Sequence, residues 1–239
     1  MSRMGKSWSC ERELSVSSLH APVEWNYDEK YNLVSMFASE MSGRSLVLNG
    51  HLDVVPAEPS DTWSRAPHIA WEQDGWLYGR GAGDMQSGVA AMIYAVHAIR
   101  HAGYQLNSPV TIQCVVEEEC SGNGTLACLE RGFGGDFVLI PEPLGPQLHA
   151  AQVGVLWFRL AIRGTPVHVL RTSSGSNAIE KLWRFVPALK TLEESLNLEG
   201  RSAPYDQLEH PFNFNIGKIK GGDWPSCVAW SPQGARLLL

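Results

Sequence analysis

The sequence predicts an α/β fold followed by a smaller α+β unit, and two patterns carry this prediction. Between residues 45 and 140, short apolar segments typical of buried strands alternate with segments of helical periodicity, which indicates a largely parallel sheet. After Ala150, alternating segments typical of half-buried strands flank one long helical segment instead. We therefore expect one unit over residues 1–152 and a second over residues 153–239.

The first unit begins with residues 1–40, which show no clear helix or strand pattern. Runs of apolar and β-branched residues then predict three strands. The strands expected here are 45–49, 110–116 and 137–140. Between the first two, apolar residues recur every three or four positions over 87–103, and Gly103 favours a helix end. A shorter helix is expected over 125–131, between the second and third strands.

The second unit should contain two strands and one long helix. Residues 153–163 and 212–220 alternate between apolar and polar positions, as half-buried strands do. Residues 177–197 carry leucine, isoleucine and phenylalanine at three- and four-residue steps, which is typical of an amphipathic helix. A strand, a helix and a strand without a parallel core favour an α+β arrangement.

Composition excludes several classes of protein. The 239 residues are 44% hydrophobic and 18% charged, which fits a globular domain and not a disordered tail or a fibre. The net charge of −6 argues against a nucleic-acid-binding surface. No apolar run approaches the roughly 18 residues of a membrane span, and the first twenty residues lack the apolar centre of a signal peptide. With five cysteines and no CxxC pair, we expect a cytoplasmic protein with reduced thiols.

Acidic residues and one histidine follow the predicted strands of the first unit. His51 and Asp53 come after the first strand, Glu117–Glu119 after the second, and Glu142 after the third. A further acid, Asp84, lies in the glycine-rich turn before the long helix. In open α/β sheets the site forms outside the carboxyl ends of the strands, so we expect these side chains to converge on one edge.

A histidine with several carboxylates is a ligand set that suits Zn²⁺, Co²⁺ or Mn²⁺. Carboxylates this dense would repel one another unless a cation neutralised them. Taken alone, each has an ordinary structural explanation: His51 as a hydrogen-bonded core residue, Asp84 as a helix cap, Glu117–Glu119 as a solvated turn. Their joint placement favours a metal site, and two ions about 3.5–4 Å apart are a known solution for amide hydrolysis.

Four ordered motifs are similar to those of a known family. GHLDVVP (50–56), GRGAGDM (79–85), EEECSGNGT (117–125) and PEP (141–143) resemble the dimetal (zinc or cobalt) deacylase/peptidase family. That family includes acetylornithine deacetylase, succinyl-diaminopimelate desuccinylase, aminoacylase and carboxypeptidase G, and the details resemble the acetylornithine deacetylase-like members most. The similarity runs from about residue 22 to about residue 226. It implies a partial zinc-peptidase-like α/β catalytic domain over 1–152 and an incomplete α+β lid and dimerisation domain over 153–239.

The resemblance also implies metal ligands. His51, Asp84 and Glu142 would bind one ion, while Asp84, as a bridge, and Glu119 would bind the other. Asp53 would orient a ligand from the second shell of the site. The cofactors implied are therefore two divalent ions, zinc or cobalt.

Catalytic and substrate-binding roles follow from the same resemblance. Glu118 would be the general base that takes a proton from a metal-bound water. Shifting the alignment by one residue leaves the alternative of Glu117 as base and Glu118 as ligand. His168, in the sequence GTPVH, matches a histidine that stabilises the oxyanion across the dimer. Asn177, in GSNAIE, matches an asparagine that contacts substrate.

The function implied is hydrolysis of the amide bond of an N-acyl amino acid or short peptide by a homodimer formed through the lid. Relative to the family the chain looks truncated at both ends, and the C-terminal histidine of the second metal site has no counterpart. Residues 228–239 show no family pattern. The alternative is therefore a non-catalytic or weakly active metal-binding and dimerising module. A nucleotide-binding protein is excluded, because GRGAGDMQSG lacks the third glycine of a dinucleotide motif.

Overall fold

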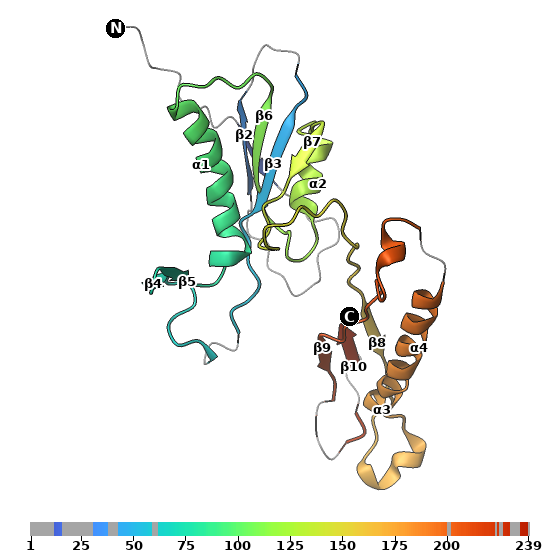
Figure 1. Cartoon of the computed structure of the whole chain (residues 1–239). Helices are drawn as coiled ribbons and strands as arrows, with labels where there is room; N and C mark the ends of the chain where they lie inside the picture. The colour runs from blue at the N-terminus through green and yellow to red at the C-terminus, as the bar shows by residue number, and fades with distance from the viewer. Residues whose placement is uncertain are drawn as a thin grey trace. The chain divides into compact units, whose positions relative to one another are not determined.

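The chain forms two compact units, Met1–Gln147 and Leu148–Leu239, in a computed structural model (Figure 1). The structure describes most residues of both units. The described ranges are 12–15, 31–37, 43–58, 62–199, 202–222, 224, 227–229 and 235–238. The expectation of no regular structure in residues 1–11 and 16–30 lies outside them.

The first unit is built on a five-stranded sheet with the order β1-β2-β6-β3-β7. Its strands are β1 Arg12–Ser15, β2 Tyr31–Phe37, β3 Leu46–His51, β6 Val110–Val115 and β7 Phe137–Leu139. β3 runs parallel to both β6 and β7, whereas β2 pairs antiparallel with β6 and with β1. The three strands expected from the sequence are confirmed, but the sheet is mixed and not largely parallel.

The strands β1 and β2 occupy a region where the sequence predicted no element. In β2 the buried positions include the polar Asn32, while Leu33 and Met36 are 39% and 58% exposed. The hydrophobic pattern therefore runs against the burial pattern, and periodicity alone could not reveal the strand. A hairpin of β4 Trp71–Gln73 and β5 Trp76–Tyr78 was also not predicted. Asp74 and Gly75 form its turn with positive φ angles, as a two-residue hairpin turn requires.

Two helices cover opposite faces of this sheet. A turn over Ala82–Gln86, in which Asp84 and Met85 have non-helical backbone angles, leads into α1 Ser87–His101. The helix α2 Asn123–Glu130 follows β6. Alternate residues of β6 divide between the two cores, because Ile112 packs with α1 and Val115 with α2. The larger core lies under α1. It consists of Leu48, Met85, Val89, Met92, Val96, Val110, Ile112 and Cys114.

The order of the strands explains where a site can form. The connection through α1 carries the chain from β3 to β6 on one side, and the connection through α2 carries it from β6 to β7 on the other side of β3. Right-handed crossovers in opposite directions place the helices on opposite faces, and sites in such sheets form at the carboxyl end of the strand where the direction changes. Here β3 lies between β6 and β7, and it ends at His51.

The second unit contains a three-stranded antiparallel sheet with the order β8-β10-β9 and two helices. The elements are β8 Arg159–Ile162, α3 Ala178–Trp183, α4 Phe185–Leu198, β9 Lys218–Lys220 and β10 Ala235–Leu238, with 3₁₀ turns at Val169–Ser174 and Tyr205–Gln207. Both predicted strands exist but are shorter than expected. β10 lies in the segment where the sequence showed no family pattern, and it forms the central strand.

The predicted helix over 177–197 is two helices that meet at Arg184. Ala178 and Leu182 of α3 are buried and form the core with Leu189 and neighbouring strand residues. Leu192 is 48% exposed, so part of the periodic apolar face lies outside this core.

Two further findings concern the cysteines and the lengths of the helices. Cys114, Cys128 and Cys227 are free thiols, and burial raises the pKa of Cys114 and Cys128. Within the described ranges, every helix is too short or too polar to cross a membrane.

Candidate functional site

His51 is the centre of the candidate site. It is the last residue of β3 and is 1% exposed. Its Nδ1 lies 2.8 Å from the backbone oxygen of Asp53, and its Nε2 lies 3.0 Å from Oδ1 of Asp84. A carbonyl oxygen only accepts, so Nδ1 carries the proton of the neutral ring and Nε2 presents a lone pair to a carboxylate. Two acceptors at this distance need a proton or a cation between them.

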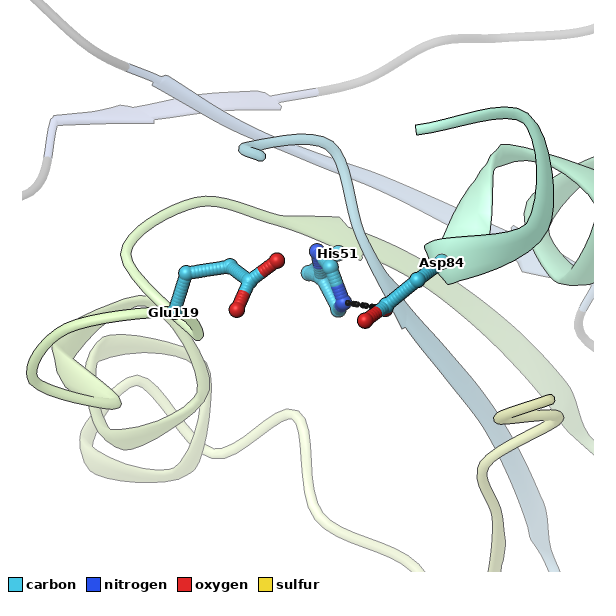
Figure 2. A group of neighbouring side chains, drawn as sticks. All are labelled: His51, Asp84 and Glu119. Carbon is cyan, nitrogen blue, oxygen red and sulfur yellow. Dashed lines mark hydrogen bonds and ion pairs between the residues drawn. The ribbon is translucent and has the colours of Figure 1, made fainter. Parts of the chain in front are cut away.

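Carboxylates surround Nε2 of His51. One ligand atom each from His51, Asp84 and Glu119 lies within 4.8 Å of the others, and Figure 2 shows the three side chains converging. Oε2 of Glu118 and Oε1 of Glu142 lie 3.8 and 3.7 Å from Nε2. A neutral imidazole with several carboxylates is the donor set of a divalent transition-metal site, so these residues fit the expected ion.

The pKa values of these groups reflect the repulsion between their neighbouring negative charges. Burial raises the pKa of Glu119, and the charge of Asp84 raises it further. Burial and the neighbouring acids Asp84 and Glu118 raise the pKa of Glu142 in the same way. Burial by itself lowers the pKa of His51, but the hydrogen bond to Asp53 and the surrounding carboxylates raise it overall. A bound cation would relieve this repulsion.

The loop after β6 is oriented by Asp53. Its Oδ1 accepts a hydrogen bond from the amide of Glu118 at 3.2 Å, and its Oδ2 accepts one from the amide of Glu119 at 3.1 Å. The neighbouring Glu117 is 1% exposed, and its Oε2 accepts hydrogen bonds from Oγ of Ser121 and Nδ2 of Asn123. Glu118 and Glu119 thus lie close to His51, whereas Glu117 is hydrogen-bonded within its own loop.

Two residues that position the site were missed from the sequence. Asn32 of β2 is fully buried, accepts a hydrogen bond from the amide of Val116 at 3.1 Å and donates one to the carbonyl of Gly124 at 2.6 Å. It is therefore hydrogen-bonded to both ends of the loop that carries Glu117–Glu119. At Gly88, a Cβ atom would overlap the backbone oxygen of Pro141, so glycine lets α1 approach the loop that carries Glu142. A polar residue within a strand and a glycine in a helix were the available signals.

The structure gathers six of the predicted site residues in the first unit. They are His51, Asp53, Asp84, Glu118, Glu119 and Glu142. The remaining two, His168 and Asn177, belong to the second unit. Nδ1 of His168 accepts a hydrogen bond from the amide of Leu170 at 3.2 Å. Asn177 is the N-cap of α3, where its Oδ1 accepts a hydrogen bond from the amide of Ile179 at 2.9 Å.

Known proteins are similar to this chain in sequence and in fold. The profile of peptidase family M20/M25/M40 matches residues 47–225. An N-formyl-4-amino-5-aminomethyl-2-methylpyrimidine deformylase from Bacillus subtilis is 33% identical over 62% of this chain and 37% of its own length. A succinyl-diaminopimelate desuccinylase from Dechloromonas aromatica is 34% identical over 74% of this chain and 47% of its own length. An acetylornithine deacetylase from Proteus mirabilis is 32% identical over 81% and 49%.

The chain spans half or less of the length of these relatives. Among solved structures, the M20 family metallo-carboxypeptidase Sso-CP2 from Sulfolobus solfataricus superposes with a TM-score of 0.60 at 15% identity. The alignment covers 88% of this chain and 59% of that protein, so the two share a fold.

Proposed function

The chain belongs to peptidase family M20/M25/M40, and from this membership we propose that it hydrolyses an amide bond with the help of bound divalent metal ions. The observation that carries the proposal is Nε2 of His51, which presents a lone pair to Asp84 with three further carboxyl side chains within reach. The substrate class is an N-acyl amino acid or a short peptide. An acetylornithine-like substrate is the finer proposal, although the named relatives act on formyl, succinyl and acetyl compounds alike.

Four side chains would hold the metal ions. We propose that His51, Asp84 and Glu142 bind one zinc or cobalt ion, and that Asp84 and Glu119 bind a second. When bound, such ions polarise the scissile carbonyl and lower the pKa of a bound water towards about 7. Asp53 keeps the proton of His51 on Nδ1 through its backbone oxygen, so that Nε2 faces the ion.

Glu118 is the proposed general base. Its side chain is 49% exposed, so a water and a substrate can reach it, and its amide is held by Asp53. Glu118 would take one proton from the attacking water and deliver it to the leaving amine.

The second unit would complete the site in a homodimer. Because Nδ1 of His168 accepts a hydrogen bond from Leu170, the neutral ring carries its proton on Nε2 and can donate it to an oxyanion. Oδ1 of Asn177 is engaged by the helix that it caps, and its Nδ2 donates one hydrogen bond to Oε1 of Glu180 at 3.5 Å, which leaves the second amide hydrogen for a substrate carboxylate or carbonyl. Both roles are proposals that rest on family motifs.

Hydrolysis of a panel of N-formyl, N-acetyl and N-succinyl amino acids tests the proposal. Purified protein is assayed with added Zn²⁺ or Co²⁺, beside Glu118→Gln and the matched surface variant Glu58→Gln. We expect metal-dependent turnover that falls by about 10²–10⁴-fold in Glu118→Gln and not in Glu58→Gln. Folded, metal-loaded protein without turnover on any member of the panel would contradict the proposal.

A second candidate function is a metal-binding and dimerising module without turnover. One observation favours it: the ligand group found in the described part of the chain contains a single histidine. The second proposed ion has only Asp84 and Glu119 as its protein ligands, and an ion with fewer protein ligands is bound more weakly. Metal binding that is lost in Asp84→Asn, together with no turnover on the panel, would support this candidate.

A further inference from the structure

A pair of histidines lies on the exposed side of α1, in its last turns. His97 and His101 are four residues apart, and both side chains are exposed. Their ring centroids lie 5.9 Å apart and their planes differ by 15°. We propose that this pair is a second metal-binding site, separate from the group of His51, Asp84 and Glu119. The pair takes Cu²⁺ or Ni²⁺ in preference to harder cations.

Helix geometry supplies the chelate. Residues at i and i+4 lie above one another on one face, so both imidazoles project in the same direction. The near-parallel rings are already adjacent, and small side-chain rotations bring one nitrogen of each to the same ion. Tyr94 packs edge-on against His97 with ring centroids 6.1 Å apart, which limits the freedom of that ring. Water would fill the remaining coordination positions.

The position at the end of the helix also favours a cation. His101 is the last residue of α1, where the final carbonyl groups carry the negative end of the helix dipole. The nearest like charge on this element is Arg100, whose guanidinium lies 5.6 Å from the ring of Phe37 and so is directed towards the sheet. The dipole and the two lone pairs therefore act together on an ion at this face.

The chemistry of this pair differs from that of the strand-end site. The sequence of α1 contains no aspartate or glutamate, so the protein ligands are imidazoles alone. Imidazole suits borderline cations, and affinity for such ligands rises from Mn²⁺ to Ni²⁺ and Cu²⁺ and falls again at Zn²⁺. The two sites are also apart, because α1 begins after Asp84 and a helix of fifteen residues is about 22 Å long.

Variants that separate chelation from the number of histidines test the proposal. The full chain is titrated with Cu²⁺ and passed over immobilised Ni²⁺, as wild type, His97→Ala and His101→Ala. His68→Ala is the control, because it removes one exposed histidine of the same unit that has no partner at helical spacing. The double variant H101A/A102H keeps the number of histidines but changes the spacing from four to five residues.

We expect His97→Ala and His101→Ala each to weaken Cu²⁺ binding by about tenfold or more and to elute earlier, because each leaves a single imidazole. H101A/A102H should behave like His101→Ala, and His68→Ala like wild type. Asp84→Asn should leave this binding unchanged, which separates the pair from the proposed catalytic metals. Equal effects of His97→Ala, His101→Ala and His68→Ala, or wild-type retention of H101A/A102H, would overturn the proposal.

Discussion

Oδ1 of Asp53 accepts a hydrogen bond from the backbone amide of Glu118, 3.2 Å away, and this contact joins the end of β3 to the loop after β6. The other carboxylate oxygen holds the amide of Glu119 in the same way. The backbone oxygen of Asp53 also accepts a hydrogen bond from Nδ1 of His51. One residue therefore orients the histidine and both glutamates that face the ligand group.

Replacing Asp53 should weaken metal binding without unfolding the chain. Asp53→Ala removes both amide acceptors, and we expect affinity for Co²⁺ to fall by about 10–100-fold, as for other residues that orient ligands. Asp53→Asn retains one acceptor and should fall between Asp53→Ala and wild type. The measurement is a Co²⁺ titration followed by absorbance, with Asp206→Asn in the second unit as control. Unchanged affinity in Asp53→Ala would show that these hydrogen bonds do not set the ligand geometry.

A methyl group at Gly88 should push α1 away from the loop of Glu142. The new Cβ atom of Gly88→Ala would meet the backbone oxygen of Pro141, which cannot rotate away. We expect a loss of about 1–3 kcal/mol in the free energy of unfolding, together with weaker metal binding. Gly83→Ala, in the turn before α1, is the matched control, because no atom lies within 4 Å of its Cβ position. Denaturant unfolding of both variants gives the comparison, and equal stabilities would refute the steric argument.

Asn32→Ala should destabilise the loop of Glu117–Glu119, because Asn32 is hydrogen-bonded to both ends of that loop. It leaves the amide of Val116 and the carbonyl of Gly124 without their side-chain partner in a buried place. Each such group costs about 1–3 kcal/mol. Urea unfolding measures the loss, and Asn107→Ala, at an exposed position, controls for the substitution itself. Amide hydrogen exchange should rise at Val116, and protection equal to wild type there would contradict the role assigned to Asn32.

Acid should destabilise the second unit through Glu193. Hydrogen bonds from the amide of Phe214 and from Lys190 hold the pKa of Glu193 below its ordinary value of 4.5. A lowered pKa stabilises the fold above the ordinary value, and that stability is lost as the pH falls through the lowered value. The melting temperature of wild type should therefore exceed that of Glu193→Gln at pH 7, and the difference should shrink below about pH 4.5. Exposed Glu194→Gln is the control, and a difference that is constant with pH would contradict the assignment.

The sequence predicted the strands and helix that have the strongest periodicity. β3 and β6 were found because their apolar residues are also buried ones, and α1 because its buried residues recur at helical spacing. β7 was found from its apolar composition, although its three residues are exposed. β2 was missed because Asn32 is buried for its hydrogen bonds while its apolar neighbours are exposed. β8 is shorter than its alternating pattern, since alternation does not say which residues find a partner strand.

The site residues of the first unit were predictable because strand ends in an α/β sheet converge whatever the details of packing. The roles of the three neighbouring glutamates were not, because the sequence allows either alignment of the loop. The structure favours Glu118 and Glu119, since Glu117 is buried against Ser121 and Asn123. Asn32 and Gly88 act through contacts with residues distant in sequence, which no local pattern reveals.

The most direct test of the account is metal binding by the strand-end group. Equilibrium dialysis against Zn²⁺ and Co²⁺ would compare Asp84→Asn with its parent, both carrying His97→Ala so that the helix pair does not contribute. We expect bound ion in the parent and at least a tenfold loss of affinity in Asp84→Asn, because Asp84 faces His51 and is shared by the proposed sites. A folded parent that binds no ion, or an Asp84→Asn variant that binds as its parent does, would contradict it.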